Sequence, residues 1–256
     1  QYRHAQLAKR VLITRPREQA DSFAEALIRA GMEPIFFPTI QIAPPQDPAP
    51  LDDALRRLEN FSWVIFTSTN AVESVWTRLD ILAISFSATV KIAAVGPKTA
   101  AALQARGLTP HFVPDEFIAE VILPGLVYVR FHHILLPLAE LAPDTLPNAL
   151  AQAGSLPHRV TAYHTHPASP APDGIAAHRA GVDVITFTSG STVRNFIALV
   201  HATGLDPLVL PDHPRIACIG PKTAAAAREA GFEVHLTAQD YTVEGILSAL
   251  TSSLAI

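Results

Sequence analysis

Short apolar runs alternate along this chain with longer amphipathic stretches. The runs at Arg10–Arg15, Phe61–Thr67 and Ile92–Val95 are rich in aliphatic and aromatic residues, which is typical of buried strands. Each is followed by a stretch with helical spacing, and two of these stretches end at a glycine that suits a helix C-terminus, Gly31 and Gly107. The alternation predicts an α/β fold whose parallel sheets are covered by helices on both faces.

The same organisation occurs twice along the chain. The motif GPKTAAA begins at Gly96 and again at Gly220, 124 positions later. The related motifs FTSTNAV and FTSGSTV begin at Phe66 and Phe187, 121 positions apart. A weaker match relates the first strand, VLITRP, to the later stretch ILLPLA. These offsets predict an internal duplication of a unit of about 123 residues.

Proline-rich stretches lie inside each repeat rather than between the repeats. A cut at these stretches predicts a discontinuous first domain built from both chain ends, a second domain from the middle, and two extended connectors. The expected ranges are 1–40 with 168–256 for domain 1, 45–162 for domain 2, and about 38–45 and 160–168 for the connectors. The connectors are expected to pair as a two-stranded β-ladder hinge between two Rossmann-like domains. The alternative is two sequential domains divided near residue 125.

Composition excludes several classes of protein. With 49% hydrophobic and 16% charged residues in 256, the chain is too apolar to be disordered. The net charge of −4 provides no basic field for nucleic acid, and the single cysteine, Cys218, excludes an intrachain disulfide and a cysteine cluster. No apolar run reaches the roughly 18 residues of a membrane span, and no apolar segment follows the charged first ten residues. A cytoplasmic globular protein with no membrane or nucleic-acid partner is therefore expected.

Candidate ligand-binding residues follow the predicted strands. In parallel α/β sheets, ligands bind beyond the carboxyl ends of the strands, where helix N-termini present free N–H groups to anions. Hydroxyl, amide, glycine and lysine residues occupy these places in both repeats: Thr67, Ser68, Asn70, Gly96, Lys98 and Thr99, then Thr188, Ser189, Gly190, Ser191, Gly220, Lys222 and Thr223. They predict one anion-binding rim in each domain, facing a cleft. The alternative is that the hydroxyls only cap helices and the lysines are solvated.

Three further residues are candidates for the ligand-binding or catalytic site. Arg15 follows the first strand and can bind an anion. Tyr163 lies in the second connector, where it can donate a proton if that connector faces the cleft; the alternative is a half-buried strand tyrosine. Tyr241 precedes the last predicted helix and either points into the same cleft or packs against that helix.

The sequence lacks the signatures of several other kinds of site. The chain contains no GxGxxG after a strand, no P-loop and no GxSxG motif, which disfavours a transferase with a nucleotide donor. His164 and His166 have strand spacing, but no carboxylate or cysteine joins them locally, so a metal site is not predicted there.

An ordered set of motifs resembles the uroporphyrinogen-III synthase family. The set comprises VLITRP, FTSTNAV, AVGPKTAAAL, TAYHT, FTSGSTV, CIGPKTAAAA and YTVEGIL, and it extends from about Val11 to Leu250. The resemblance implies cyclisation of hydroxymethylbilane to uroporphyrinogen III, with inversion of ring D through a spirocyclic intermediate and without a cofactor. It also implies two α/β domains joined by a two-stranded ladder. A site of this kind acts mainly by orienting a flexible polyanion.

The resemblance also suggests roles for individual residues. Tyr163, in TAYHT, matches the position of the family's proposed acid, and the residues of the rims would hold substrate carboxylates. Leu138 stands where many members carry an arginine, so that contact is absent here or supplied elsewhere, for instance by Arg130. A monomer that receives its substrate by transient hand-off from hydroxymethylbilane synthase is expected. The competing hypothesis is a two-lobed α/β anion-binding protein without catalysis.

Overall fold

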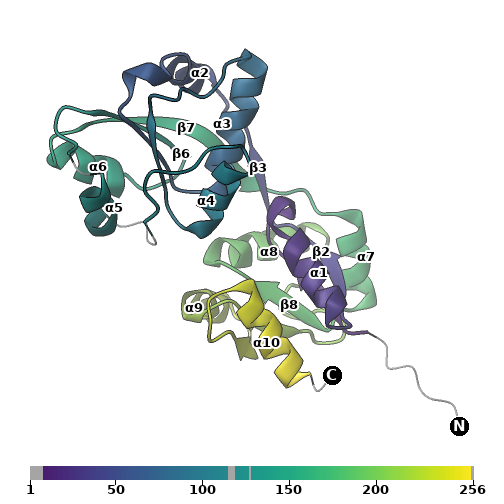
Figure 1. The fold of residues 1–256 in the computed structure, drawn as a ribbon. Helices are drawn as coiled ribbons and strands as arrows, with labels where there is room; N and C mark the ends of the chain where they lie inside the picture. The colour runs from purple at the N-terminus through teal and green to yellow at the C-terminus, as the bar shows by residue number, and fades with distance from the viewer. Residues whose placement is uncertain (1–7, 115–118, 127, 255–256) are drawn as a thin grey trace, which may run out of the picture. The chain divides into compact units, whose positions relative to one another are not determined.

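The computed structural model describes residues 8–114, 119–126 and 128–254, which form two compact units. Unit 1 comprises the residues up to Gln41 together with those from His166 onward, and unit 2 comprises Ile42–Thr165. The first and last described stretches of the chain therefore belong to one unit (Figure 1). Residue 125 falls inside unit 2, so a division of the chain at that point does not describe this structure. Residues 1–7 lie outside the described residues.

Unit 1 contains a five-stranded sheet in the order β10-β9-β8-β1-β2, and every neighbouring pair is parallel. Its strands are β1 (Arg10–Ile13), β2 (Glu33–Phe36), β8 (Val184–Phe187), β9 (Arg215–Cys218) and β10 (Leu236–Thr237). Its helices are η1 (Arg17–Gln19), α1 (Asp21–Arg29), α7 (Pro172–Ala180), α8 (Gly190–Ala202), α9 (Pro221–Glu229) and α10 (Val243–Ser253).

Unit 2 contains the second sheet, in the order β3-β7-β6-β4-β5. The pairs formed by β7, β6, β4 and β5 are parallel. Its strands are β3 (Ile40–Ala43), β4 (Trp63–Phe66), β5 (Lys91–Ala94), β6 (His133–Ala139) and β7 (Leu156–Pro167). Its helices are α2 (Ala49–Leu55), η2 (Leu58–Asn60), α3 (Thr69–Leu82), α4 (Pro97–Gln104), α5 (Ala119–Gly125) and α6 (Thr145–Gln152). The predicted α/β class with parallel sheets is confirmed.

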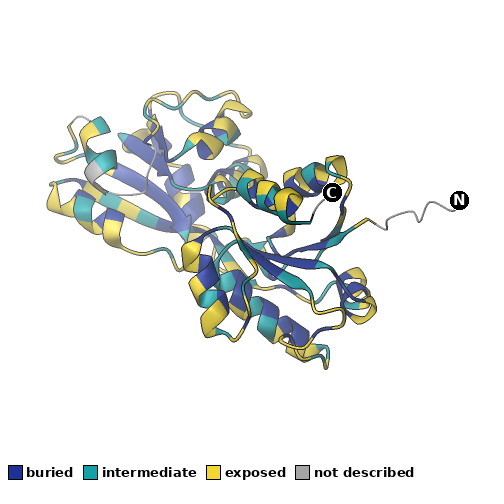
Figure 2. Cartoon of the chain, turned by 90° about the horizontal axis from the view of Figure 1, so that it is seen from below, coloured by how far each residue is buried: buried dark blue, intermediate teal, exposed yellow. Residues whose placement is uncertain are grey.

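The central strands are buried on both faces, which explains their uninterrupted apolar sequences (Figure 2). In unit 1, Phe23 and Leu250 bring α1 and α10 against one face, while Phe196 belongs to the cluster of α7, α8 and α9 on the other. In unit 2, α2, α3 and α4 share one core cluster with the sheet, and α6 packs in a separate cluster. Among the described residues, no helix has the length and apolarity that crossing a bilayer requires.

The duplication is interleaved. Four strands of each five-stranded sheet come in equal numbers from the two copies, and equivalent strands take equivalent places: β2-β1-β8-β9 in unit 1 matches β7-β6-β4-β5 in unit 2. A histidine that follows each GPKT helix marks the same symmetry. Nδ1 of His111 accepts a hydrogen bond from Ile92 N at 3.1 Å, and Nδ1 of His235 accepts one from Ile216 N at 3.0 Å.

The segments predicted as connectors contain β3 and the end of β7. β3 and β7 are neighbours, but they are members of the five-stranded sheet of unit 2. β7 is 12 residues long and pairs with β6 from Leu156 to Tyr163. Tyr163 therefore belongs to the sheet and core of unit 2 rather than to a free-standing ladder.

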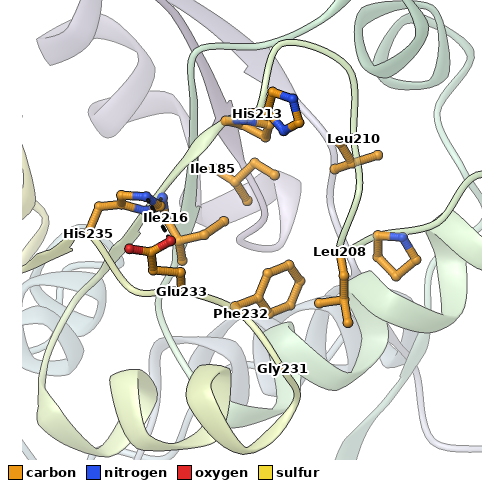
Figure 3. A pocket seen from close by; sticks show the side chains of 11 residues that line it. Ile185, Leu208, Leu210, His213, Ile216, Gly231, Phe232, Glu233 and His235 are labelled. Carbon is orange, nitrogen blue, oxygen red and sulfur yellow. Dashed lines mark hydrogen bonds and ion pairs between the residues drawn. The ribbon is translucent and has the colours of Figure 1, made fainter.

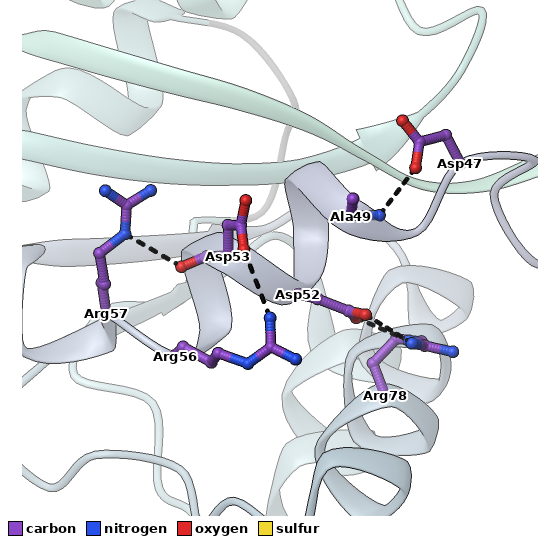
Figure 4. Close-up of polar contacts among 7 residues, drawn as sticks. All are labelled: Asp47, Ala49, Asp52, Asp53, Arg56, Arg57 and Arg78. Atoms are coloured by element: carbon purple, nitrogen blue, oxygen red, sulfur yellow. Dashed lines mark hydrogen bonds and ion pairs between the residues drawn. The ribbon is translucent and has the colours of Figure 1, made fainter.

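A partly buried ion pair joins α2 to α3 in unit 2. Nε and Nη2 of Arg78 donate to the two carboxylate oxygens of Asp52 at 2.7 and 2.6 Å (Figure 4). The two side chains are 19% and 10% exposed, and the hydrogen bonds to Asp52 raise the pKa of Arg78. Two parallel charge-assisted bonds fix the relative rotation of the helices as well as their separation.

We expect Asp52→Ala to lower the free energy of unfolding by about 2 kcal/mol, because it leaves the Arg78 guanidinium partly buried without its partner. Chemical denaturation of the full chain measures this loss. The neighbouring Asp53, whose exposed carboxylate pairs with Arg56 at 3.3 Å, provides the matched control Asp53→Ala, for which a change within about 0.5 kcal/mol is expected. Equal losses in the two variants would contradict the assignment.

Candidate functional site

The predicted site residues lie at the carboxyl-terminal edge of the sheet in each unit. In unit 2, segments that follow β4 and β5 carry Thr67–Asn70 and Gly96–Thr99, and Tyr163 pairs with the last residue of β6. In unit 1, Arg15 lies two residues beyond β1, and residues 188–191 and 220–223 follow β8 and β9. Each unit thus gathers its own candidates at the edge where parallel α/β sheets bind ligands.

Ser68 and Tyr163 form the central contact of the unit 2 rim. Ser68 is the N-cap of α3, and its Oγ accepts a hydrogen bond from Ala71 N at 3.1 Å. The same Oγ lies 3.1 Å from the Tyr163 hydroxyl. Because Ser68 Oγ already accepts from the backbone, its own proton is available to the phenol oxygen, and the phenol proton is then free for another acceptor. Ser68 is thus both a cap and a partner of the tyrosine.

A register shift in β7 orients Tyr163. Leu138 of β6 pairs with Thr161, but the next residue, Ala139, pairs with Tyr163, so Ala162 is the extra residue of a bulge. Strict alternation would place Val160 and Ala162 on one face and Tyr163 on the other. Instead, all three belong to the core cluster on the α3 face. Bulges next to functional sites commonly redirect a side chain in this way.

The remaining candidates of unit 2 surround the start of α4. Gly96 is its N-cap at φ +84°, a conformation that favours glycine, and Pro97 occupies the first turn. Lys98 is exposed, whereas Thr99 is 4% exposed and, within the described chain, its hydroxyl has no hydrogen-bond partner. Thr99 therefore does not cap the helix. Thr67 and Asn70 are half-buried beside Ser68.

In unit 1, the segment after β8 forms a capping box. Ser189 Oγ accepts from Thr192 N at 3.2 Å, and Thr192 Oγ1 accepts from Ser189 N at 3.1 Å. Ser191 Oγ lies 2.9 Å from Ser189 Oγ. The capping interpretation therefore holds for Ser68 and Ser189, while Thr188, Gly190 and Ser191 are half-buried on the same rim. A cap does not exclude a ligand, since the other N–H groups of the first turn stay free.

Arg15 lies at the point where the strand order of unit 1 reverses, between β1 and β8. Thr14 Oγ1 donates to Thr186 O, and Thr39 Oγ1 donates to Thr14 O, which together hold the end of β1 in place. The Arg15 Nε is buried and has no hydrogen-bond partner among the residues that the structure describes. Burial lowers the pKa of Arg15, and the Glu244 carboxylate partly offsets that effect. An incoming anion would give this guanidinium the acceptor it lacks.

The second GPKT motif differs from the first in how its glycine is used. Gly220 is extended, at φ −172°, but a Cβ there would stand 3.1 Å from Cδ1 of Tyr241. Glycine thus suits the backbone conformation at Gly96, whereas at Gly220 it allows the Tyr241 ring to approach closely. Tyr241 is 66% exposed, so it covers the GPKT turn rather than anchoring α10 in the core. Lys222 is exposed, and Thr223, which is buried, has no hydrogen-bond partner for its hydroxyl within the described residues.

The structure corrects the expectation that Arg130 could replace an arginine at position 138, and it adds Arg159 and Arg194 to the candidate residues. Leu138 is fully buried in the unit 2 core. Arg130 precedes β6, at the opposite edge of the sheet, so it does not replace an arginine at position 138. Arg159 of β7 instead donates hydrogen bonds to the carbonyls of Ala139 and Glu140, both at 3.1 Å, and so stabilises the loop that follows β6. No local sequence signal indicates this role, because it depends on strand pairing.

The second added residue is Arg194 in unit 1. Its Nη1 lies 3.4 Å from the place where a Cβ of Gly190 would stand. A cation is therefore held over the first turn of α8. In the sequence, Arg194 could be found from its spacing of four residues, about one helical turn, from Gly190.

Other features of the described chain lie apart from these rims. A pocket of about 170 Å³ in unit 1 has an apolar floor that includes Ile185 and Phe232, with His213, His235 and Glu233 at its margin (Figure 3). None of the predicted site residues lines it. Cys218 is a buried free thiol whose pKa burial raises to about 11. Among the described residues, no group of three or more His, Cys, Asp or Glu is arranged to hold a metal ion.

Comparison of the sequence with known proteins identifies similar chains over nearly its whole length. A family model described as uroporphyrinogen-III synthase HemD matches residues 21–248. A uroporphyrinogen-III synthase from Synechococcus elongatus is 37% identical over 250 residues, which cover 95% of each chain.

Two solved structures share the fold. A uroporphyrinogen-III synthetase from Helicobacter pylori superposes with a TM-score of 0.61 at 18% identity and covers 96% of this chain and 99% of its own. A mutant uroporphyrinogen III synthase from the extremely thermophilic bacterium Thermus thermophilus superposes with a TM-score of 0.59 at 22% identity and covers 97% and 99%. At these identities the likeness concerns the architecture of two α/β units.

Proposed function

Because this chain belongs to the uroporphyrinogen-III synthase family, we propose that it closes hydroxymethylbilane to uroporphyrinogen III with inversion of ring D, using Tyr163 as the acid. The chain is a cyclising lyase of tetrapyrrole biosynthesis. The observation that carries the assignment is the family match over residues 21–248. Family membership disfavours the alternative of a two-lobed anion-binding protein without catalysis.

The Ser68–Tyr163 contact supports a role in departure of the substrate hydroxyl. A phenol O–H placed beside the leaving oxygen transfers its proton as the carbon–oxygen bond breaks, and the hydroxyl leaves as water. The exposed carbon is then attacked by ring D, which leads to the spirocyclic intermediate. The Ser68 hydroxyl, 3.1 Å away, donates to the phenolate oxygen that remains and holds it in place. Ser68 is a positioning residue in this scheme.

The rims of both units are proposed to hold the eight carboxylates of the substrate. Most of the donors are neutral: hydroxyls, and backbone N–H groups at the starts of α3, α4, α8 and α9. Arg15, with its unpartnered buried Nε, is the strongest charged candidate. Many weak contacts suit a reaction whose main requirement is one geometry for a flexible chain.

We also propose that segments 1–40 with 168–256 and 45–162 behave as separate domains, with the connectors near 38–45 and 160–168 as the hinge. The enzyme is further proposed to be a cytoplasmic monomer that takes hydroxymethylbilane directly from its synthase. Rapid hand-off limits spontaneous closure, which proceeds without inversion of ring D.

An isomer assay tests the function. Hydroxymethylbilane is generated in situ by its synthase, the full chain is added, and the oxidised products are separated into type I and type III. We expect type III to predominate in proportion to the protein added. A product that stays type I, as in the reaction without added protein, would refute the cyclase and favour a binding protein.

Valine substitution tests the GPKT threonines as substrate contacts. Valine keeps the shape of Thr99 and Thr223 and removes only a hydroxyl that makes no hydrogen bond within the described chain. We expect the double variant Thr99→Val/Thr223→Val to raise KM about 10-fold with little change in kcat, since each lost hydrogen bond is worth about 0.5–1.5 kcal/mol. The melting temperature should stay the same. A lower melting temperature with an unchanged KM would make the threonines structural.

A further inference from the structure

Unit 2 has a polar pocket at the edge of its sheet opposite to Ser68 and Tyr163. It has a volume of about 400 Å³ and is lined by Arg57, Asn60, Phe61, His133 and His158. His133 is the first residue of β6 and His158 is near the start of β7. The pocket is therefore at the amino-terminal edge of these strands, whereas Tyr163 is at their carboxyl-terminal edge.

Backbone hydrogen bonds hold the pocket walls in place. Asn60 N donates to Arg57 O at 2.9 Å and Phe61 N donates to Leu58 O at 3.0 Å, which defines the η2 turn. Ser62 N then donates to His133 O at 2.8 Å and ties this turn to β6. His158 is positioned by its pairing with Leu135. The lining residues come from three separate elements that are all fixed by main-chain bonds.

The side chains of the pocket form a cluster of donors. Nδ1 of His133 lies 2.7 Å from Nε2 of His158, so one imidazole donates to the other, and the Phe61 ring meets His158 edge-on with 5.2 Å between centroids. Nε of Arg57 donates to Asp53 O at 3.1 Å, and its two terminal nitrogens have no partner within the described chain (Figure 4). No carboxylate lines the pocket, and the carboxylate of the nearby Asp53 pairs with Arg56.

The Arg57 guanidinium provides the positive charge of this cluster. Burial, and then the charges of His133 and Arg57, lower the pKa of His158, so this imidazole favours its neutral form. A negatively charged oxygen in the pocket would balance the guanidinium charge and would accept hydrogen bonds from the terminal Arg57 nitrogens. Arginine suits carboxylates and phosphates because its planar fork binds two oxygens at once. A divalent cation, in contrast, would be repelled by Arg57.

We infer that this pocket binds a small molecule through an oxyanion group, held by Arg57, His133 and His158, at a site separate from the proposed catalytic rim. Both a carboxylate and a phosphate have the required chemistry. Asn60 can add an amide donor, and the half-buried Phe61 ring provides an apolar wall for the rest of the ligand. The inference is independent of the proposed cyclase reaction.

Calorimetric titration of the full chain with inorganic phosphate and, separately, with tricarballylate tests the inference and distinguishes phosphate from carboxylate ligands. We expect at least one probe to bind and Arg57→Met to weaken it about tenfold or more, as for loss of a charge-assisted hydrogen bond. His133→Gln should also weaken it. The matched control is Arg56→Met, which removes a neighbouring exposed arginine that does not line the pocket and should change affinity less than twofold.

Three results would overturn the inference. The first is failure of both probes to bind the wild-type chain, and the second is binding that Arg57→Met leaves unchanged. The third is binding of Zn²⁺ instead of either anion, lost in His133→Gln but kept in Arg57→Met, which would make the histidine pair a metal site. The histidine signals in NMR spectra of wild type and variants confirm folding and locate the bound probe.

Discussion

Replacing Tyr163 by phenylalanine is expected to lower kcat about 100-fold, the lower part of the range found when a general acid is removed. The ring is 8% exposed and packs in the α3-side core of unit 2, so its apolar contacts remain. Only the hydroxyl contact to Ser68 is lost, and the free energy of unfolding should fall by no more than about 1 kcal/mol. The isomer assay gives kcat, and thermal unfolding gives stability.

The chain offers matched controls for this substitution. Tyr128→Phe removes the hydroxyl of an exposed tyrosine in the same unit and should leave kcat unchanged. Ser68→Ala should lower kcat less than Tyr163→Phe does, and Ser68→Thr should restore it, because threonine keeps both the cap and a hydroxyl beside the phenol. If Tyr163→Phe turns over at the wild-type rate, Tyr163 is not the acid and its contact with Ser68 is structural.

The second large effect concerns stability at low pH and comes from His178 in α7. This side chain is 2% exposed, and its ring lies against Phe37 and Phe196 at centroid distances of 4.9 and 5.5 Å. Within the described part of the chain, neither ring nitrogen has a hydrogen-bond partner. Burial lowers the pKa of His178 from 6.5 to about 4. The folded chain therefore keeps this imidazole neutral at a pH where the unfolded chain protonates it.

The sign of the pH dependence follows from this difference. Above pH 6.5 both states are neutral at this residue, and the stability is unaffected. As the pH falls from 6.5 toward 4, only the unfolded state takes up the proton, so stability is lost. The loss attributable to His178 should be about 2 kcal/mol at pH 5 and about 3 kcal/mol when complete, at 1.36 kcal/mol for each pKa unit.

His178→Leu should remove this component of acid destabilisation. Leucine is apolar and of similar size, so it also removes two unsatisfied buried nitrogens and should stabilise the chain at neutral pH. Denaturant unfolding between pH 7.5 and pH 4.5 measures the difference from wild type. His201→Leu, at an exposed position in α8, is the control and should keep the wild-type pH dependence. Parallel pH curves for wild type and His178→Leu would contradict the buried neutral state.

The opposite edges of the unit 2 sheet are assigned different chemistry. At the carboxyl-terminal edge, hydroxyls and helix N-termini provide neutral donors around Ser68 and Tyr163. At the amino-terminal edge, Arg57, His133 and His158 line a pocket in which the guanidinium provides the positive charge. Because the two sites share no residue, loss of anion binding in Arg57→Met is expected to leave production of the type III isomer unchanged.

Features carried by contiguous residues were predictable from the sequence. The strand–helix alternation, the two GPKT turns and the serines that cap α3 and α8 depend on local spacing, and the structure contains all of them. The repeat offsets also predicted the duplication, and the position of the proline-rich stretches inside each repeat predicted that the copies are interleaved. The parallel α/β class follows from the same pattern, because strands that are apolar on both faces and alternate with helices are typical of parallel sheets covered by helices on both sides.

Features that join distant segments were decided only by the tertiary structure. Tyr163 reaches Ser68, 95 positions away, because a bulge at Ala162 turns it to the α3 face, whereas simple alternation indicates the opposite face. Arg159 serves the loop after β6 because β7 pairs with that strand. Periodicity specifies which residues are buried. The strand register, which depends on the packing of the whole sheet, decides which of them meet.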